Sequence, residues 1–140
     1  MHGRKPLPPA DSKGVARVLS EHPFRETVER VEALIQRQGA IVFARIDFAG
    51  DARAAGLRLR PTYLLLFGSP RAGTPVLQAR PTAALDLPLK IVVREDDDGK
   101  VWILYNEPEY LELRHAIPRE LDRVLDGVAR IALEAAGPAR

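Results

Sequence analysis

Three blocks between residues 43 and 75 decide the fold, and they read FARID (43–47), GLRLRPT (56–62) and FGSPRAGTP (67–75). The first block ends a β-branched and aromatic run over residues 40–47, which predicts a strand because glycines bound it on both sides. Alternate side chains of a strand share one face. We therefore expect Phe43, Arg45 and Asp47 to point to the same side of the sheet.

Residues 57–67 predict a second strand. Pro61 lies within this run and has no N–H donor, so the strand should lie at a sheet edge or carry a bulge. Glycine and proline over residues 68–75 predict a turn, after which residues 76–79 should pair back as a short strand. The alanine-rich stretch 49–55 predicts a short helix.

Helices and a hairpin flank these blocks. Apolar residues recur at helical spacing over residues 24–38 and 118–136, which predicts two long helices with one buried face each. Residues 15–19 predict a short strand. The alternating runs 87–95 and 99–106 surround an Asp-Gly step, which is typical of a β-hairpin.

This order of elements predicts an α+β fold, a two-layer domain whose antiparallel sheet buries one face under the two long helices. We expect a single domain over residues 14–137. Residues 1–13 hold three prolines among charged side chains and predict a flexible N-terminal arm.

Composition limits the classes of function. The 140 residues include 21 basic and 19 acidic side chains, scattered among each other, so no basic surface for nucleic acid is expected. The longest apolar run is far shorter than the roughly 20 residues that cross a bilayer, and no signal peptide is visible. The chain contains no cysteine. We therefore expect a cytoplasmic protein that binds neither nucleic acid nor membrane.

The three blocks resemble the DUF302 family of uncharacterised bacterial and archaeal domains, as do ALDLPLK (84–90) and the pairs VW, YN, YL and RH between residues 101 and 115. The resemblance covers about residues 24–115. It implies a TATA-binding-protein-like fold in the order β-α-β4-α, a homodimer, and no assigned activity. Two positions depart from the family pattern: Phe48 replaces a usual histidine, and Ser69-Pro70-Arg71 replaces Asn-Pro-Lys.

A charged cluster is the strongest candidate for a ligand site. Arg45 and Asp47 share a strand face, and a buried charge needs a partner. With Arg60, Thr62 and Lys90 from neighbouring strands they predict a pocket for a small anionic ligand, in which Asp47 orients the cationic donors. The alternative is an internal ion-pair network or a dimer contact.

These observations leave three hypotheses. The first is a non-catalytic dimer, binding or regulatory, that holds a small anionic ligand. The second is a structural or protein-interaction dimer, which contacts its copy through residues 57–67 and the aromatic hairpin. The third is an enzyme that uses Asp47 or Asp86 as a general acid or base. No cofactor is expected. Because His2, His22 and His115 are isolated in the sequence, no metal site is expected either.

Overall fold

The computed structural model describes residues 13–138, so residues 1–12 of the expected arm lie outside the described part. It confirms the α+β fold and the β-α-β4-α order, with short helices added between the strands. The elements are β1 (Val15–Leu19), α1 (Phe24–Arg37), β2 (Ile41–Asp47), α2 (Phe48–Ala54), β3 (Thr62–Gly68), α3 (Pro70–Ala79), the 3-10 turn η1 (Pro81–Leu85), β4 (Leu89–Glu95), β5 (Val101–Asn106), α4 (Pro108–His115), the 3-10 turn η2 (Arg119–Leu121) and α5 (Arg123–Ala136).

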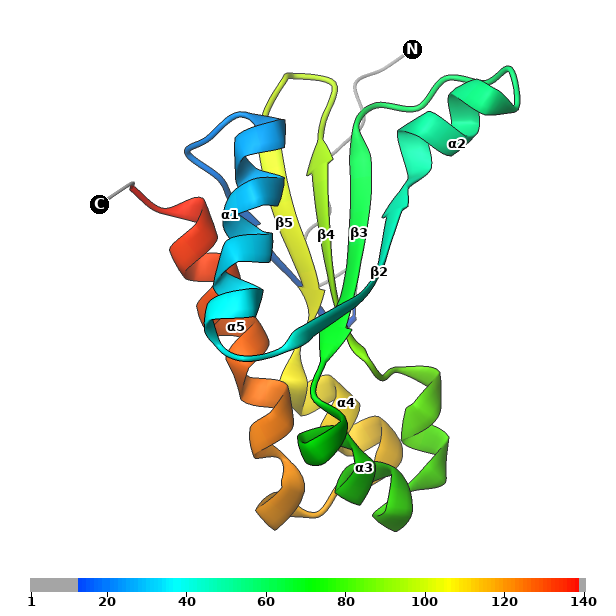
Figure 1. The fold of residues 1–140 in the computed structure, drawn as a ribbon, viewed down its shortest axis with the longest axis vertical. Helices are drawn as coiled ribbons and strands as arrows, with labels where there is room; N and C mark the ends of the chain where they lie inside the picture. The colour runs from blue at the N-terminus through cyan, green and yellow to red at the C-terminus, as the bar shows by residue number, and fades with distance from the viewer. Residues whose placement is uncertain (1–12, 139–140) are drawn as a thin grey trace.

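The five strands form one antiparallel sheet in the order β1-β5-β4-β3-β2. Helices α1 and α5 lie side by side and pack against the sheet, as the two long helices were expected to do (Figure 1). The shorter helices lie at the ends of the strands. In Figure 1, α3 and α4 lie below the sheet, whereas α2 and the connection after it extend beyond its upper edge.

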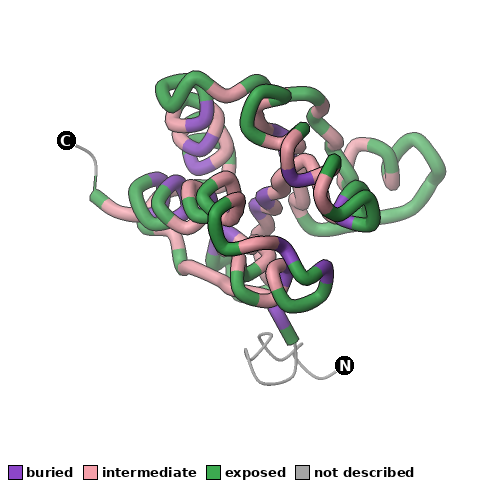
Figure 2. The backbone as a smooth tube through the Cα atoms, turned by 90° about the horizontal axis from the view of Figure 1, so that it is seen from below, coloured by how far each residue is buried: buried purple, intermediate pink, exposed green. Residues whose placement is uncertain are grey.

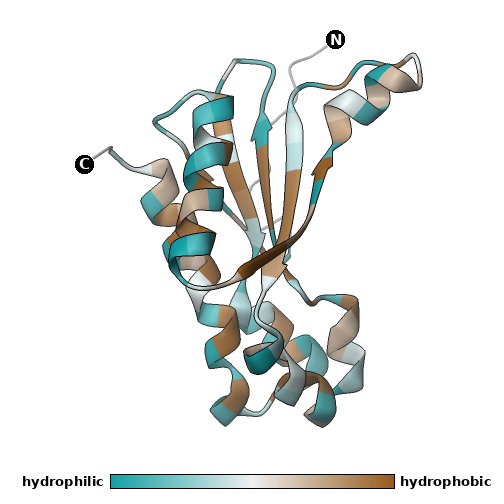
Figure 3. Cartoon of the chain, viewed as in Figure 1, coloured by the Kyte–Doolittle hydropathy of each residue, from teal (hydrophilic) through white to brown (hydrophobic). Residues whose placement is uncertain are grey.

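The core lies between the sheet and the two long helices. Val31 and Ile35 of α1 meet Ile131 and Ala132 of α5 over Leu65 and its neighbours on the sheet. In Figure 2 exposed residues occupy most of the outer loops of the backbone, whereas many of the buried residues lie toward the middle of the fold. Hydrophobic residues gather along the central strands, whereas the outer sides of the helices are hydrophilic (Figure 3). One buried stripe per helix therefore explains the apolar spacing read from the sequence.

Pro61 does not lie inside a strand, contrary to the sequence-based expectation. β3 begins at Thr62, and residues 57–60 form an exposed connection before it. β3 is also not an edge strand, because it pairs with β2 on one side and β4 on the other. The edge strand beside β3 is β2, whose pairing with β3 shifts between Val42 and Ala44; β1 forms the other edge of the sheet. Because Pro61 lies just before β3, its missing N–H leaves no gap among the hydrogen bonds between the strands.

The predicted turn over residues 68–75 is wrong. Residues 70–79 form helix α3, with Pro70 in its first turn, and residues 76–79 belong to this helix instead of a strand. The Ser69 hydroxyl accepts a hydrogen bond from the N–H of Ala72 at 3.4 Å and so caps the helix. A serine cap followed by proline is a helix start signal, because proline fixes φ where no N–H donor is needed. Similarly, α5 begins at Arg123, later than expected, because η2 intervenes after Pro118.

The second face of the sheet carries a mixed surface. Strand alternation directs Leu64, Leu66, Val92 and Leu104 away from the core side chains, and all four are half-buried. Lys90 lies on this same face, paired in register with Leu66. Its Nζ donates to the carbonyl oxygen of Pro88 at 3.1 Å. Partial burial lowers the pKa of the Lys90 ammonium group, and nearby Asp86 offsets the effect in part.

Truncation of the α1 core contact should be strongly destabilising. Ile35 is fully buried in the α1–sheet–α5 core, so Ile35→Ala leaves a cavity and should lower the free energy of unfolding by about 2–5 kcal/mol. Ile41 is half exposed on the edge strand, and Ile41→Ala is the matched control, with an expected loss of about 0.5 kcal/mol or less. Urea denaturation measures both. Equal losses would place Ile35 outside the main core.

Lys90 should leave a pH signature on stability. The pKa of Lys90 is lower in the folded state than in the unfolded state. Just below the ordinary lysine pKa, the unfolded chain therefore binds more protons than the folded chain. The free energy of unfolding should rise with pH in that range. Lys90→Met should remove this rise, whereas Lys100→Met at an exposed position should retain it. Denaturation across the alkaline range tests the sign. If the free energy of unfolding of Lys90→Met rose with pH as it does in the wild type, Lys90 would not be the source of the rise.

Candidate functional site

The structure does not bring the five predicted ligand residues together. Arg45 pairs in register with core residue Leu65 and points to the helix-covered side of the sheet. There it forms an ion pair with Glu32 of α1, and its Nε donates to the Glu32 carboxylate at 3.0 Å. The hydrogen bond from Arg45 lowers the pKa of Glu32 below its usual value. Arg45 therefore joins the edge strand to α1.

Asp47 has a structural role at the start of α2. Its Oδ1 accepts a hydrogen bond from the N–H of Gly50 at 3.0 Å, and the carboxylate caps the helix. A Cβ at position 50 would lie 2.5 Å from Asp47 Oδ2, so glycine permits this close approach. Asp47 is exposed. Within residues 13–138, no hydrogen bond or ion pair joins it to the other predicted ligand residues.

Arg60 and Thr62 are neighbours, but Lys90 lies elsewhere. Arg60 donates to Glu95 Oε2 at 2.6 Å and to the carbonyl oxygen of Asp96 at 2.7 Å, so it anchors the connection before β3 to the β4–β5 hairpin. The Thr62 hydroxyl donates to the carbonyl oxygen of Arg60. Thr62 and Lys90 share the second face of the sheet, opposite to Arg45, and belong to different ends of it. The expected pocket of five residues is therefore not formed.

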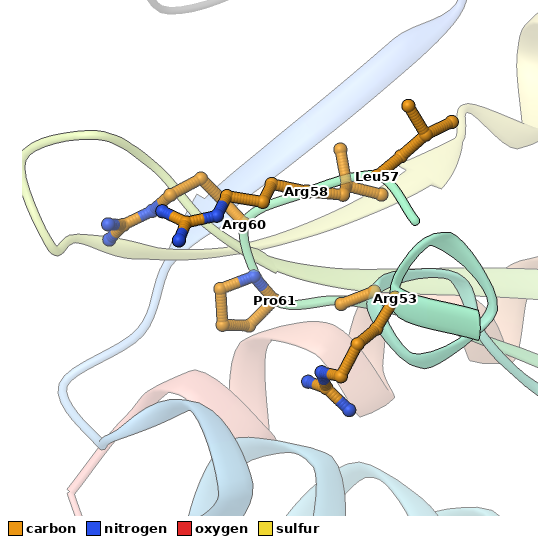
Figure 4. A pocket seen from close by; sticks show the side chains of 7 residues that line it. Arg53, Leu57, Arg58, Arg60 and Pro61 are labelled. Atoms are coloured by element: carbon orange, nitrogen blue, oxygen red, sulfur yellow. The ribbon is translucent and has the colours of Figure 1, made fainter. Parts of the chain in front are cut away.

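A cationic groove lies next to Arg60, between α2 and the connection to β3. It has a volume of about 560 Å³, and we call it the arginine-lined groove; its lining residues are Ala49, Arg53, Leu57, Arg58, Leu59, Arg60 and Pro61. The side chains of Arg58 and Arg60 extend to the same side, whereas Arg53 projects from α2 on the other side of Pro61 and Leu57 extends away from all three (Figure 4). No acidic residue lines the groove. Sequence patterns missed Arg53 and Arg58, because Arg53 belongs to the predicted helix 49–55, Arg58 to the predicted strand 57–67, and no spacing in the sequence joins the two.

The arginines of this groove differ in their bonding. Arg60 is held by Glu95 and the Asp96 carbonyl group. For Arg53 and Arg58, no ion pair or side-chain hydrogen bond is found within residues 13–138. Both are exposed, so their guanidinium groups are hydrated and available to an added anion.

A second cluster lies at the opposite end of the sheet, between η1 and α4. The His115 side chain is 3% exposed, and its Nε2 lies 2.5 Å from Asp86 Oδ2. Its Nδ1 lies 3.0 Å from the Thr82 hydroxyl. Arg114 donates to the same Asp86 oxygen at 3.0 Å. His115 is far from the other histidines in the sequence, but folding brings it to Asp86 across 29 positions of sequence.

Within residues 13–138, no group of three or more His, Cys, Asp or Glu side chains is arranged to hold a metal ion. In the same residues, no helix has both the length and the apolar character needed to cross a bilayer. No local spacing links Asp86 to His115. The signal that could have found them is the resemblance itself, since residues 84–90 and the Arg114-His115 pair belong to the segments that carry it.

Comparison with known proteins gives relatives of two kinds. The chain is 37% identical over 141 residues to proteins named fluoride-specific ion channel FluC 1 from Brucella suis and Brucella abortus, with 98% of this chain covered. The match covers 56% and 52% of those relatives, so the chain spans about half of their length. A third relative, from Brucella melitensis, is named fluoride-specific ion channel FluC 2.

A solved structure has the same fold. The crystal structure of an uncharacterised conserved DUF302 protein from Bacillus stearothermophilus matches with a TM-score of 0.73 at 20% identity, covering 89% of this chain and 96% of that one. A family model described as domain of unknown function DUF302 matches residues 16–135, which is most of the sequence. The chain therefore belongs to the DUF302 family, as its sequence blocks indicated.

Proposed function

We propose that this DUF302 domain binds a small anion in the arginine-lined groove and acts as a binding or regulatory module there, without chemistry at that place. One observation carries the proposal: three arginines line one groove from which acidic side chains are absent. The anionic ligand expected from the sequence is retained, but its site changes. Of the five residues first expected, only Arg60 lines this groove.

The chemistry of guanidinium groups favours this assignment. A guanidinium is planar, always charged, and more weakly hydrated than an ammonium group, and its N–H donors match the paired oxygens of a carboxylate or phosphate. Like charges held close together repel one another, and a bound anion relieves that repulsion. Arg58 and Arg53 have side chains free to close on such a ligand, whereas Arg60 is fixed by Glu95.

The named relatives make fluoride the first anion to test. They are called fluoride-specific ion channels, and this chain matches about half of each. In those relatives the matching region belongs to the same chain as the part that this sequence does not cover. We infer that the domain senses or buffers an anion beside such a channel. Acetate and inorganic phosphate are the matched probes, because they present paired oxygens to the same donors.

The arginine-lined groove should be required for stabilisation by anions. In the wild type, an anion at 100 times its Kd should raise the free energy of unfolding by about 2.7 kcal/mol. Arg53→Gln combined with Arg58→Gln should abolish this gain, because no charged donor besides the anchored Arg60 remains. Thermal unfolding with fluoride, acetate and phosphate at constant ionic strength provides the measurement.

Arg123→Gln combined with Arg130→Gln, at two exposed positions of α5, is the matched control for the loss of two charges. It should bind the anion as the wild type does. An equal response of the groove variant, the control and the wild type would reject the groove as the site. No response of the wild type to any of the three anions would reject the proposed function.

A dimer is a second proposal, supported by one specific observation. Ile41 and Phe43 of the edge strand β2, with Phe48 at the start of α2, are large apolar side chains exposed along one edge of the molecule. An edge strand also offers unpaired backbone N–H and C=O groups to another chain. The surface that was expected over residues 57–67 shifts to β2 in this proposal, because β3 is an internal strand.

A charge placed on the β2 edge should therefore weaken self-association. We expect a dimer at micromolar concentration in multi-angle light scattering, with an interface of about 1,000 Å² or more. Phe43→Glu should shift the protein toward monomer, whereas Leu133→Glu, on an exposed position of α5, should remain dimeric. A wild-type monomer under these conditions would eliminate the proposal.

A further inference from the structure

The Asp86–His115–Thr82 cluster has an arrangement that the anion-binding proposal does not use. Three side chains are joined in a row: a carboxylate, an imidazole and a hydroxyl. His115 is buried in the middle and Asp86 is 17% exposed, whereas Thr82 lies on the surface. The cluster belongs to the end of the molecule opposite to α2, where η1 and α4 lie (Figure 1).

The donors and acceptors of this row determine where its protons lie. A carboxylate accepts hydrogen bonds, and Asp86 Oδ2 also accepts one from the neighbouring Arg114 guanidinium. The short contact between Asp86 and His115 therefore places the imidazole proton on Nε2. The unprotonated Nδ1 is then an acceptor, and the Thr82 hydroxyl must donate to it.

An imidazole that accepts a hydroxyl proton while a carboxylate holds its other nitrogen is the arrangement that activates an oxygen nucleophile. The charged groups around it are Asp86 and Arg114, with Lys90 close enough to Asp86 for its pKa to respond. The positive charge formed when His115 takes a proton would face the Asp86 carboxylate directly. Burial of His115 excludes water from this contact and strengthens it.

Thr82 is accessible to a substrate. It belongs to the 3-10 turn η1, in which residues three apart lie one above the other. Leu85 is therefore next to Thr82 on the same side of η1, and its side chain is 71% exposed. An exposed apolar side chain beside an exposed hydroxyl provides a contact for the acyl group of a small, uncharged ester.

We propose that Thr82 is the nucleophile of an acyl-transfer site that hydrolyses small uncharged esters, with His115 as general base and Asp86 as the positioning residue. Thr82 Oγ1 attacks the ester carbonyl carbon as its proton passes to His115 Nδ1. The bond to the leaving oxygen breaks, and His115 returns the proton to that oxygen. Water then attacks the acyl-threonine, His115 takes the water proton, and the acid leaves as Oγ1 is reprotonated.

A purely structural role for the same row predicts a different behaviour. If the Thr82 hydroxyl only satisfies the buried His115, its replacement should change stability and nothing else. Thr82→Val retains the shape of the side chain and removes the hydroxyl. Because Thr82 is exposed, this variant should fold, and its melting temperature checks that it does. Thr74→Val, at an exposed position of α3, is the matched control.

The test uses p-nitrophenyl acetate as the ester and follows release of p-nitrophenol by the purified chain. We expect kcat of the wild type and of Thr74→Val to exceed that of Thr82→Val by about 100-fold, which is the lower range for general-base catalysis. Thr82→Ser should retain activity. Asp86→Asn should lower kcat with KM unchanged, as loss of a positioning charge requires. Mass spectrometry of quenched samples should find one acetyl group on the peptide that contains Thr82.

Two results would overturn the proposal. One is a rate in Thr82→Val equal to that of the wild type. The other is acetylation of His115 or a lysine in place of Thr82, because the hydroxyl would then have no covalent role. These results are independent of the arginine-lined groove, since Arg53→Gln with Arg58→Gln should leave ester hydrolysis unchanged.

Discussion

Burial of one face of a five-stranded sheet under α1 and α5 is the constraint on which the rest of the molecule depends. Fully buried side chains from both layers, such as Ile35, Leu65 and Ile131, meet there and leave no space for a charge. Charged side chains of the strands are therefore confined to the edge of this core or to the second face. Arg45 illustrates the first case and Lys90 the second.

This constraint separates the charged residues that the sequence placed together. Arg45 lies at the sheet edge and binds Glu32, so its charge stabilises the contact between β2 and α1 and does not face a ligand. Asp47 caps α2, and Arg60 ties the connection to the hairpin. Each of these charges finds its partner within its own neighbourhood, and because these side chains are exposed, each pair contributes only modestly to stability.

Both proposed sites lie at the ends of the strands, outside the core. The arginine-lined groove belongs to α2 and the connection that follows it, and residues 53–60 of this segment are all exposed. The Asp86–His115–Thr82 row belongs to η1 and α4, which pack in a second, smaller cluster around Leu111 and Ala83. Connections that emerge from a rigid sheet are common places for function, because the scaffold positions them while their side chains remain accessible.

The sequence by itself determined the elements whose signal is local. The apolar spacing of α1 and α5, the Asp-Gly hairpin and the DUF302 blocks predicted the α+β fold, because one buried face per element leaves a periodic trace. Only the tertiary structure decided the register of β2 on β3, which pairs Arg45 with Leu65 and so separates it from Lys90. Likewise, only folding brought His115 to Asp86 and placed Arg53 and Arg58 along one groove, since arrangements of distant or irregular segments leave no periodic pattern in a chain.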